Sequence, residues 1–339
     1  MSEQNSALSE FFYEVTPERV LDAVESLGVR CTGRVLQLNS LENRVYEVEL
    51  DVDDPDQLPS KWDAYRIVKF YRPGRWSVEQ IREEHEFLAE CKDAELPVVA
   101  PLPFPDGSTL RQVPGLSIQF AIFPKVAGRI MDEMSREQLL QVGRLLARLH
   151  GVGMRRPHRY RMKLTVETLG RSSLRYLNEN GVLPESIKGY YNQIAERLFS
   201  TTEPWFDGVA SQRIHGDCHI GNILWSRDEL FVVDFDDSFM GPCVQDLWLL
   251  TPGRDEDSIR QRDTILEGYE FMRDFDRSTL RLIEPLRALR MIYFSSWIAK
   301  RYEDPAFKKV FVDFGSDRYW REQLVALQEV GEVLGIGYQ

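Results

Sequence analysis

Three polar residues between positions 214 and 237 have types and a spacing that suit phosphoryl transfer from ATP. The segment reads IHGDCHIGNILWSRDELFVVDFDD, with Asn222 five residues after Asp217 and Asp234 twelve residues after Asn222. Such a transfer needs a carboxylate that orients an attacking hydroxyl, and oxygen ligands that hold Mg²⁺ against the β- and γ-phosphates. Amide and carboxylate oxygens both suit Mg²⁺. A loop with Asp217 and Asn222, beside a strand that ends at Asp234, would supply all three groups from one compact unit.

Two histidines, His215 and His219, flank Asp217 in this segment. Imidazole and carboxylate groups are usual ligands of transition metals, so the H-x-D-x-H run is also compatible with a metal cluster. That interpretation leaves Asn222 and Asp234 without a role. We therefore favour support of the loop as the role of the two histidines.

A lysine, Lys69, lies inside the apolar strand predicted at residues 65–71 (YRIVKFY). A buried cation needs a partner, and a kinase-like site needs a lysine that holds the ATP phosphates and is paired with a helical glutamate. Glu84 on the following predicted helix is a candidate partner, and Glu83 is its adjacent competitor. Taken alone, these residues are also compatible with a solvent-facing lysine and a solvated acidic helix face.

Several motifs resemble those of a known family. HGDCHIGNILW resembles the catalytic-loop signature of the aminoglycoside phosphotransferase-like kinases, VDFDD resembles their metal-binding segment, and GPCVQDLWLL resembles their following helix. Over nearly the whole chain, the motifs NSLENRVYEV, IVKFYRPGRW, EEHEFLAE, LPVVAPLP and EPLRALR are similar to the stress response kinase A group. The resemblance implies a bilobal kinase-like fold and a cytoplasmic enzyme that uses Mg²⁺ and ATP to phosphorylate Ser or Thr of proteins.

The resemblance also implies roles for individual residues. Asp217 becomes the proton acceptor, and Asn222 and Asp234 become the magnesium ligands. Lys69, held by Glu84, would neutralise charge on the ATP phosphates. The aspartate of GPCVQDLWLL would have a structural role.

The turn at residues 39–43 (NSLEN) differs from the familiar nucleotide-covering loop, because it has no G-x-G-x-x-G pattern. A turn of this composition by itself predicts only a hairpin. The stress response kinase A group has a similar NSxEN turn, and this likeness implies that Ser40 belongs to the ATP site. The adenine is expected at the connector after Phe120–Phe123, at main-chain groups near Phe123 and Val126.

Two other features suggest binding surfaces. The basic run Met154–Lys163 (MRRPHRYRMK) is compatible with contact to RNA or an acidic protein, but we favour a solvated loop after a helix. The aromatic residues Tyr293, Phe294, Trp297 and Tyr302 lie on a predicted helix pair, and we interpret them as core packing rather than as a substrate box.

Hydrophobic periodicity and capping residues predict the elements that position these side chains. Strands are expected from residue 33 onward, with clear segments at 45–50, 65–71 and 116–123, and helices at 17–28 and 77–92. After Pro124 the pattern is helical, at 135–150, 166–178, 184–199, 257–275, 277–300 and 319–334, with a small hairpin at 223–225 and 230–235. The prediction is an α+β fold with a nucleotide-binding lobe at 1–124 and a helical catalytic and substrate lobe at 125–339.

Composition excludes several other classes of protein. The 339 residues include 42 Lys+Arg and 54 Asp+Glu, a net charge of −12, and residues 1–60 hold 13 acidic and four basic side chains. This acidic start repels phosphate and argues against nucleic-acid binding. The longest uncharged stretch, Gln112–Pro124, is shorter than the ~20 residues that span a bilayer. Met1–Ser9 lacks the pattern of a secretory leader, and four scattered cysteines suggest neither a zinc site nor disulfides. We expect a cytoplasmic monomer without a membrane or nucleic-acid partner.

The leading hypothesis is therefore an ATP- and Mg²⁺-dependent kinase acting on Ser/Thr of proteins. One alternative is the same chemistry on a small-molecule hydroxyl, such as an aminoglycoside, homoserine or a choline-like alcohol, because the catalytic motif does not select the acceptor. Another is a nucleotide-binding regulatory module with little catalysis. The presence of all five polar residues of the expected site argues against that module.

Overall fold

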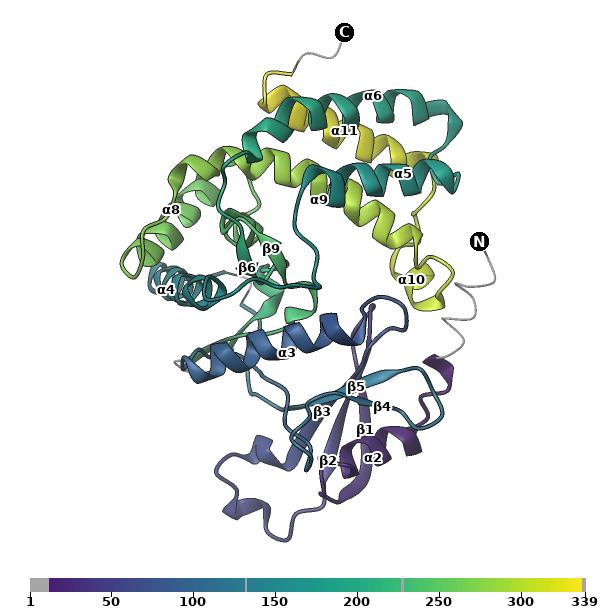
Figure 1. The fold of residues 1–339 in the computed structure, drawn as a ribbon, viewed down its shortest axis with the longest axis vertical. Coiled ribbons are helices and arrows are strands. Elements are labelled where there is room, and N and C mark those ends of the chain that lie inside the picture. The colour runs from purple at the N-terminus through teal and green to yellow at the C-terminus, as the bar shows by residue number, and fades with distance from the viewer. Residues whose placement is uncertain (1–11, 132, 227–228, 337–339) are drawn as a thin grey trace.

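The first third of the chain forms an antiparallel sheet (Figure 1). The structure is a computed structural model and describes residues 12–131, 133–226 and 229–336. The strands are β1 (Cys31–Leu38), β2 (Arg44–Leu50), β3 (Tyr65–Phe70), β4 (Arg111–Gln112) and β5 (Gln119–Pro124). Their order across the sheet is β1-β2-β3-β5-β4, and all neighbours are antiparallel. β3 is therefore the central strand.

Alternation along β3 sends its side chains to two different cores. Val68 and Phe70 join a hydrophobic cluster with helix α2 (Pro17–Glu25), whereas Ile67 packs against the cluster that contains helix α3 (Val78–Asp93). Side chains on a strand alternate between faces, so Lys69 lies on the same face as Ile67. The central strand thus directs Lys69 toward α3.

Helix α3 lies between the sheet and the rest of the molecule (Figure 1). A capping box starts it, because Ser77 accepts from the Gln80 amide and the Gln80 side chain accepts from the Ser77 amide. Its buried residues include Ile81, Phe87 and Leu88 and also the charged Glu83 and Glu84. Buried charged side chains need partners close by, so Glu83 and Glu84 should have hydrogen-bond or ion-pair partners on neighbouring segments.

The remainder of the chain is mainly helical. Its helices are α4 (Arg136–Gly153), α5 (Ser172–Glu179), α6 (Glu185–Thr202), α7 (Val244–Leu250), α8 (Glu256–Glu270), α9 (Ile283–Ala299), α10 (Pro305–Val310) and α11 (Asp317–Val333). Helices α5, α6, α9 and α11 share one hydrophobic core, at the end of the molecule far from the sheet (Figure 1). Helices α4, α7 and α8 share a second core with α3.

Two short strand pairs lie between α6 and α7 and carry the loops of interest. β6 (Gln212–Ile214) pairs with β9 (Phe239–Gly241), and β7 (Ile223–Ser226) pairs with β8 (Glu229–Val232). The loop from β6 to β7 contains Asp217, and the loop from β8 to β9 contains Asp234. In sequence, the paired strands β7 and β8 lie between the paired strands β6 and β9, and this nesting brings the two loops together.

The predicted α+β, bilobal kinase-like fold class is confirmed. β5 ends at Pro124, the predicted lobe boundary, although the division into two domains stays a prediction. Some boundaries differ: the expected helix at 166–178 begins as a π-helical turn, Val166–Arg171, and that at 277–300 begins as a 3₁₀ turn, Arg277–Leu282. The short strands β6 and β9 and helix α10 escaped prediction, because three to six residues carry too little periodicity.

The described residues bear on the expectation about membrane-spanning helices but not on the expectation about a secretory leader. None of the described helices combines the length and apolar character needed to cross a membrane. The polar segment Met1–Ser9 lies outside the described residues.

Candidate active site

A buried carboxylate holds the loop that carries Asp217 through hydrogen bonds to its main chain. Asp246, at the start of α7, accepts hydrogen bonds from the amides of His215 (2.9 Å) and Gly216 (2.8 Å). Gly216 has φ +86°, and a Cβ there would lie 2.3 Å from the carbonyl oxygen of Asp237. The chain turns sharply at Gly216 because only glycine fits both the dihedral angle and the space. Asp217 follows directly on this fixed turn.

The two histidines brace the loop. His215 donates from Nε2 to the carbonyl of Val233 (2.9 Å), and its Nδ1 accepts from the Asp217 amide (3.3 Å). His219 accepts from the Gly221 amide at Nδ1 (3.0 Å). In the part of the chain that the structure describes, no group of three or more His, Cys, Asp or Glu residues is arranged to hold a metal ion, which argues against the transition-metal cluster.

The carboxylate of Asp217 faces an arginine from a distant helix. Arg290 on α9 approaches Oδ1 of Asp217 to 2.7 Å, and Nε2 of His219 lies 3.6 Å from Oδ2. Burial by itself raises the pKa of Asp217, but Arg290 and the two nearby histidines outweigh it, so its pKa lies below the ordinary value. Asp217 is therefore an anion at neutral pH, as a hydrogen-bond acceptor for a substrate hydroxyl must be.

Asn222 and Asp234 present oxygen atoms on the two adjacent loops. The Asn222 side chain donates from Nδ2 to the main-chain oxygen of Asp217 (2.9 Å), which leaves its amide oxygen for a cation. Asp234 has a left-handed backbone (φ 62°, ψ 64°), rare for a residue with a side chain, and its side chain is 58% exposed. One neutral oxygen, from the buried Asn222, and one anionic oxygen, from the exposed Asp234, fit a hard divalent cation.

Lys69 joins the sheet to these loops. Its ammonium lies 3.6 Å from Glu84 on α3, 3.5 Å from Asp234 and 3.0 Å from Asp236. Lys69 is only 8% exposed. Burial by itself lowers the pKa of Lys69, but Asp236 and Glu84 outweigh it and hold the pKa well above its ordinary value. Lys69 is a fixed positive charge at the junction of the two lobes, and its helical partner is Glu84.

Glu83 has a different role from its neighbour. Its carboxylate accepts hydrogen bonds from the amides of Arg159, Tyr160 (3.0 Å) and Arg161 (2.9 Å). These three residues belong to the basic run Met154–Lys163, so Glu83 holds that run against α3. The adjacent glutamates thus divide between two tasks.

The solvated-loop interpretation of this basic run is wrong for Arg161. The Arg161 guanidinium is buried; it contacts Glu84 (3.0 Å) and donates to the carbonyls of Asp236 (2.5 Å) and Ser238 (3.0 Å). Glu84 therefore has two cationic partners, Lys69 and Arg161. A run with such regular charge looks solvated in sequence, and only the fold reveals that one member supports the site.

Asp236 and Arg75 are two site residues that sequence reasoning missed. Asp236 is 4% exposed and contacts Lys69 and Arg75, the latter at 2.6 Å. Burial raises its pKa, but Lys69 and Arg75 together lower it below the ordinary value. Both residues stand in motifs already noted, VDFDD and YRPGRW, yet nothing in their local spacing distinguishes them from surface charges.

The predicted ATP-site residues of the sheet lie beside this network. The Ser40 hydroxyl accepts from the amide of Asn43 (3.3 Å), whose side chain donates to Asp236 (3.3 Å). Phe123 on β5 is buried, and Val126 follows the end of that strand, two residues past Pro124. Lys69 pairs with Ala121 across β3 and β5, and the connector after Phe123 begins three residues beyond Ala121.

A cavity of about 130 Å³ opens beside Asp217. Asp217, Asp237, Gln245 and Arg290 give its polar lining, and most of the remaining wall is apolar or aromatic, including Trp76, Tyr293, Phe294 and Trp297. The core-packing interpretation is wrong for Phe294, which is 41% exposed. Tyr293 and Trp297 pack against the helical core, as expected, and also line the cavity. Tyr302 does pack inside the helical core, with its ring centroid 4.9 Å from that of Phe314.

The arrangement matches a known family. The sequence model of the Phosphotransferase enzyme family matches residues 35–283. The chain belongs to this family. Its matched region contains Ser40, Lys69, Glu84 and the whole segment from Asp217 to Asp234. Members of the family use ATP, typically with a divalent metal, and the chain is a phosphotransferase with a hydroxyl acceptor.

Curated relatives within the phosphotransferase family extend over nearly the full chain. Stress response kinase A of Escherichia coli (strain K12) is 37% identical over 331 residues, 97% of this chain and 96% of the relative. Serine/threonine protein kinase RdoA of Salmonella typhimurium (strain LT2) is 39% identical over 324 residues, 95% of this chain and 94% of the relative. The predicted resemblance to the stress response kinase A group is thereby confirmed.

Solved structures show the same fold at lower identity. Amicoumacin kinase hAmiN, in complex with AMP-PNP, Ca²⁺ and Ami, superposes with a TM-score of 0.70 at 18% identity, covering 93% of this chain and 96% of that one. Spectinomycin phosphotransferase, in complex with ADP and spectinomycin, gives 0.62 at 13% identity, covering 92% and 93%. These likenesses establish the architecture of the phosphotransferase family in this chain.

Proposed function

We propose that this phosphotransferase is a Mg²⁺-dependent serine/threonine protein kinase that acts in a bacterial stress response. The observation that carries the proposal is one network of contacts, in which Lys69 from the sheet meets Asp234 beside Asp217 and Asn222. The names of the curated relatives support a protein acceptor and the stress role. ATP is the phosphoryl donor.

Each residue of the network has one task in the proposed reaction. Asp217 accepts a hydrogen bond from the acceptor hydroxyl and aligns that oxygen for in-line attack on the γ-phosphorus. Lys69, held by Glu84, neutralises phosphate charge. Ser40 and the amides of its turn contact the phosphates, and main-chain groups near Phe123 and Val126 contact the adenine.

Asn222 and Asp234 are the residues that would hold Mg²⁺. When bound, the ion stabilises negative charge that develops on the β- and γ-phosphate oxygens. Asp234 is held for this task by its backbone conformation and by Lys69 at 3.5 Å. The exposed carboxylate is open on the side away from the lysine.

The lining of the cavity beside Asp217 supports an acceptor hydroxyl carried on a partly apolar group, because aromatic side chains make up much of its wall. The aromatic wall also offers little to a polycation, since Arg290 and Arg75 already neutralise Asp217 and Asp237. The alternative acceptor is a small-molecule alcohol, which the named acceptors of the solved neighbours favour.

Incubation with radiolabelled ATP and Mg²⁺ tests the proposal. Purified protein is mixed with a panel of proteins and, separately, with a panel of alcohol metabolites, and Asp217→Asn serves as the inactive control. Label on Ser or Thr of protein is the expected result. Label on metabolites alone would establish the alternative, and turnover of neither panel would leave a regulatory nucleotide-binding module.

The remaining parts of the proposal concern the surroundings of the enzyme. We propose a cytoplasmic monomer with no nucleic-acid or membrane partner, and lobes at 1–124 and 125–339. The net charge of −12 supports the absence of a nucleic-acid partner, because the acidic start of the chain repels phosphate. Sedimentation of the purified protein, with and without nucleic acid, tests the monomeric state and the absence of a nucleic-acid partner.

A further inference from the structure

A buried glutamate ties the Ser40 turn to the helical part of the molecule. Glu42, two residues after Ser40, is 8% exposed. Its Oε2 atom accepts a hydrogen bond from Nε1 of Trp297 (2.6 Å) and lies 2.6 Å from Nε of Arg301. Trp297 is near the end of α9, and Arg301 follows that helix. A turn of the sheet is thus attached to an element more than 250 residues away in sequence.

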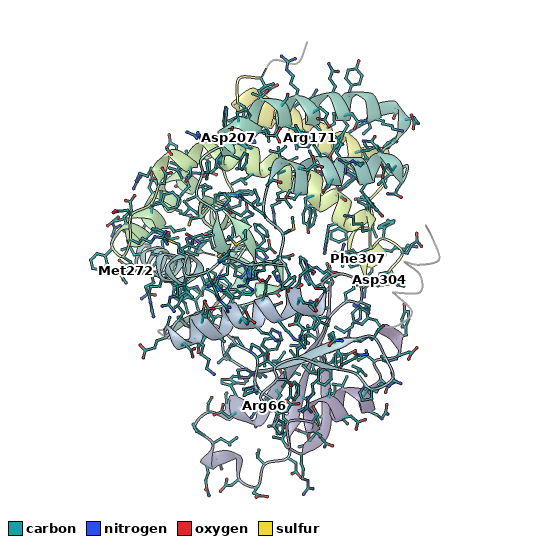
Figure 2. All side chains as sticks on the ribbon, viewed as in Figure 1. Arg66, Arg171, Asp207, Met272, Asp304 and Phe307 are labelled. Atoms are coloured by element: carbon teal, nitrogen blue, oxygen red, sulfur yellow. The ribbon has the colours of Figure 1, made fainter. Side chains whose placement is uncertain are left out.

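Arginines that follow β3 complete the attachment. Arg72 lies 3.2 Å from Glu42 and 2.8 Å from Asp304, and Arg75 lies 3.3 Å from Glu42. Asp304 and Phe307 lie where α10 approaches the sheet (Figure 2). The Arg72 guanidinium is centred 5.6 Å from the Phe307 ring. The contact is a network of fixed charges rather than an isolated surface pair.

The charge state of Glu42 suits a permanent contact. Burial by itself raises the pKa of Glu42, but Arg75, Arg301 and Arg72 outweigh it, so the pKa lies below the ordinary value. A buried carboxylate is costly unless it is fully partnered, and a well-packed apolar contact would hold two lobes together at lower cost. A polar contact at this place therefore points to a role in specificity or coupling.

Trp297 has a second contact that suggests what is coupled. Its indole lines the cavity beside Asp217 and stacks on Phe294, with ring centroids 5.3 Å apart and an interplanar angle of 18°. One face of the side chain therefore belongs to the proposed acceptor site, and its N–H belongs to the turn that carries Ser40. The hydrogen bond from Trp297 thus joins α9 directly to that turn.

We propose that Glu42 and Trp297 are positioning residues that couple the nucleotide turn to the acceptor wall. The inference rests on the proposed assignment of Ser40 to the ATP site and of the cavity to the acceptor. An acceptor that packs on Trp297 restricts the indole to one position. The indole N–H then holds the Glu42 carboxylate, and Glu42 holds the turn that carries Ser40 over the phosphates. By linkage, nucleotide and acceptor then raise each other's affinity by the same factor.

The test measures binding of a non-hydrolysable ATP analogue with Mg²⁺, by calorimetry, in the full chain. Trp297→Phe keeps the aromatic wall and removes the N–H donor, and Glu42→Gln removes the charge. Although Trp297 lies on the acceptor side, we expect each variant to bind the analogue about tenfold more weakly, the usual effect of losing a hydrogen bond to a charged group. The double variant should lose clearly less than the product of the two single losses, because both changes act on the contact between Trp297 and Glu42.

Glu49→Gln is the matched control. Glu49 is a glutamate of β2 whose partners, Thr32 (2.9 Å) and Arg34 (3.4 Å), lie in the same sheet. It should bind the analogue like the wild type, and combined with Trp297→Phe it should give no more than the effect of Trp297→Phe. Thermal melting of every variant separates weaker binding from unfolding.

The outcomes separate this inference from the proposed function. If the wild type fails to bind the analogue, the proposed ATP site is wrong. If the wild type binds it and Trp297→Phe binds it equally well, the coupling inference is overturned while the proposed function stands. A loss of analogue affinity near a hundredfold in the double variant, the product of the two single losses, would also overturn it, since the residues would then act independently. Should Glu42→Gln fail to fold, the comparison of wild type with Trp297→Phe still decides.

Discussion

Arg290 lies 2.7 Å from Asp217, although 73 residues separate the two in sequence. The arginine side chain is 34% exposed. Both residues line the cavity beside the loop. The contact explains why a carboxylate in a largely covered position remains charged.

Replacement of Arg290 should move the acid limb of the pH profile. A reaction that needs ionised Asp217 loses activity as pH falls through the pKa of that group. Arg290 lowers this pKa, so Arg290→Gln raises it and the acid limb shifts to higher pH. The measurement is the rate of phosphate transfer per enzyme over pH 4 to 8. Arg287→Gln, one helical turn earlier and paired with Glu284, is the control and should keep the wild-type limb.

Substitution of the two loop aspartates should separate transfer from binding. Asp217→Asn keeps the size of the side chain but removes the acceptor charge, and we expect transfer to fall by about 10²- to 10⁴-fold with nucleotide affinity retained. Asp234→Asn should instead abolish the dependence of nucleotide affinity on Mg²⁺. Calorimetric titration of an ATP analogue with and without Mg²⁺ distinguishes the two variants. Normal transfer by Asp217→Asn would contradict the proposed mechanism.

Local spacing in the sequence identified the parts of the site that lie within single loops. Asp217 and Asn222 share one loop, and the Asn222 side chain reaches back to the Asp217 carbonyl, so a five-residue separation already implies the contact. Lys69 was recognisable because a lysine in an apolar strand needs a partner. The α+β class followed from the change of hydrophobic period near Pro124, whereas the kinase-like fold followed from the resemblance of the motifs.

Partners that come from distant segments were not predictable in the same way. Arg161 and Arg290 reach the site only after α4 and α9 have packed, and no local pattern separates a buried arginine from a solvated one. The local pattern left the choice between Glu83 and Glu84 open for a related reason, and the family resemblance favoured Glu84, the residue that pairs with Lys69. Successive helix residues differ by about 100° in direction, and α3 is enclosed on both sides, so both directions are buried.

The cavity-lining role of the aromatic residues of α9 was missed because core packing and lining a cavity give the same sequence pattern. Tyr293, Phe294 and Trp297 recur at helical spacing, as core residues do. They differ from ordinary core residues because they share a cavity with the carboxylate of Asp217, which lies on a loop distant in sequence.

Glu84 and Glu83 should give different defects when each is changed to glutamine. Glu84→Gln removes a charge partner of Lys69 and should weaken nucleotide binding, because the lysine is then drawn toward Asp236. Glu83→Gln loses acceptors for the amides of residues 159–161 and should lower the melting temperature more than it changes nucleotide affinity. Paired melting curves and titrations check this. Equal defects in both measurements would contradict the division of tasks.

A methyl group at Gly216 should disrupt the candidate site. Gly216→Ala places a Cβ 2.3 Å from the Asp237 carbonyl and forces a side chain into φ +86°. We expect lower stability and a loss of transfer that exceeds the loss of stability, since Asp217 is the next residue. Gly189→Ala is the matched control in α6, where an added Cβ meets nothing within 4 Å. It should be neutral or slightly stabilising in thermal melts, because alanine favours the helix.

Acid should destabilise the protein through a buried histidine. His85 on α3 contacts the Tyr71 hydroxyl and the Thr109 hydroxyl, both at 2.8 Å, and burial, with Lys69 and Arg161 nearby, lowers its pKa to about 3. The unfolded chain binds a proton at this histidine below its ordinary pKa of about 6.5, whereas the folded chain does not until about pH 3. Stability is therefore fully present above pH 6.5 and is lost as pH falls through this window.

His85→Gln removes that titration while it keeps a donor and an acceptor in place. The variant should melt at a lower temperature than the wild type at pH 7, because the packing is altered, but its melting temperature should fall less between pH 6.5 and pH 4. The slope of melting temperature against pH is the quantity to compare, and parallel curves for the two proteins would refute the assignment. His158, whose pKa burial also lowers to about 3, titrates in the same window, so part of the acid slope should remain in His85→Gln and decrease further when both histidines are replaced.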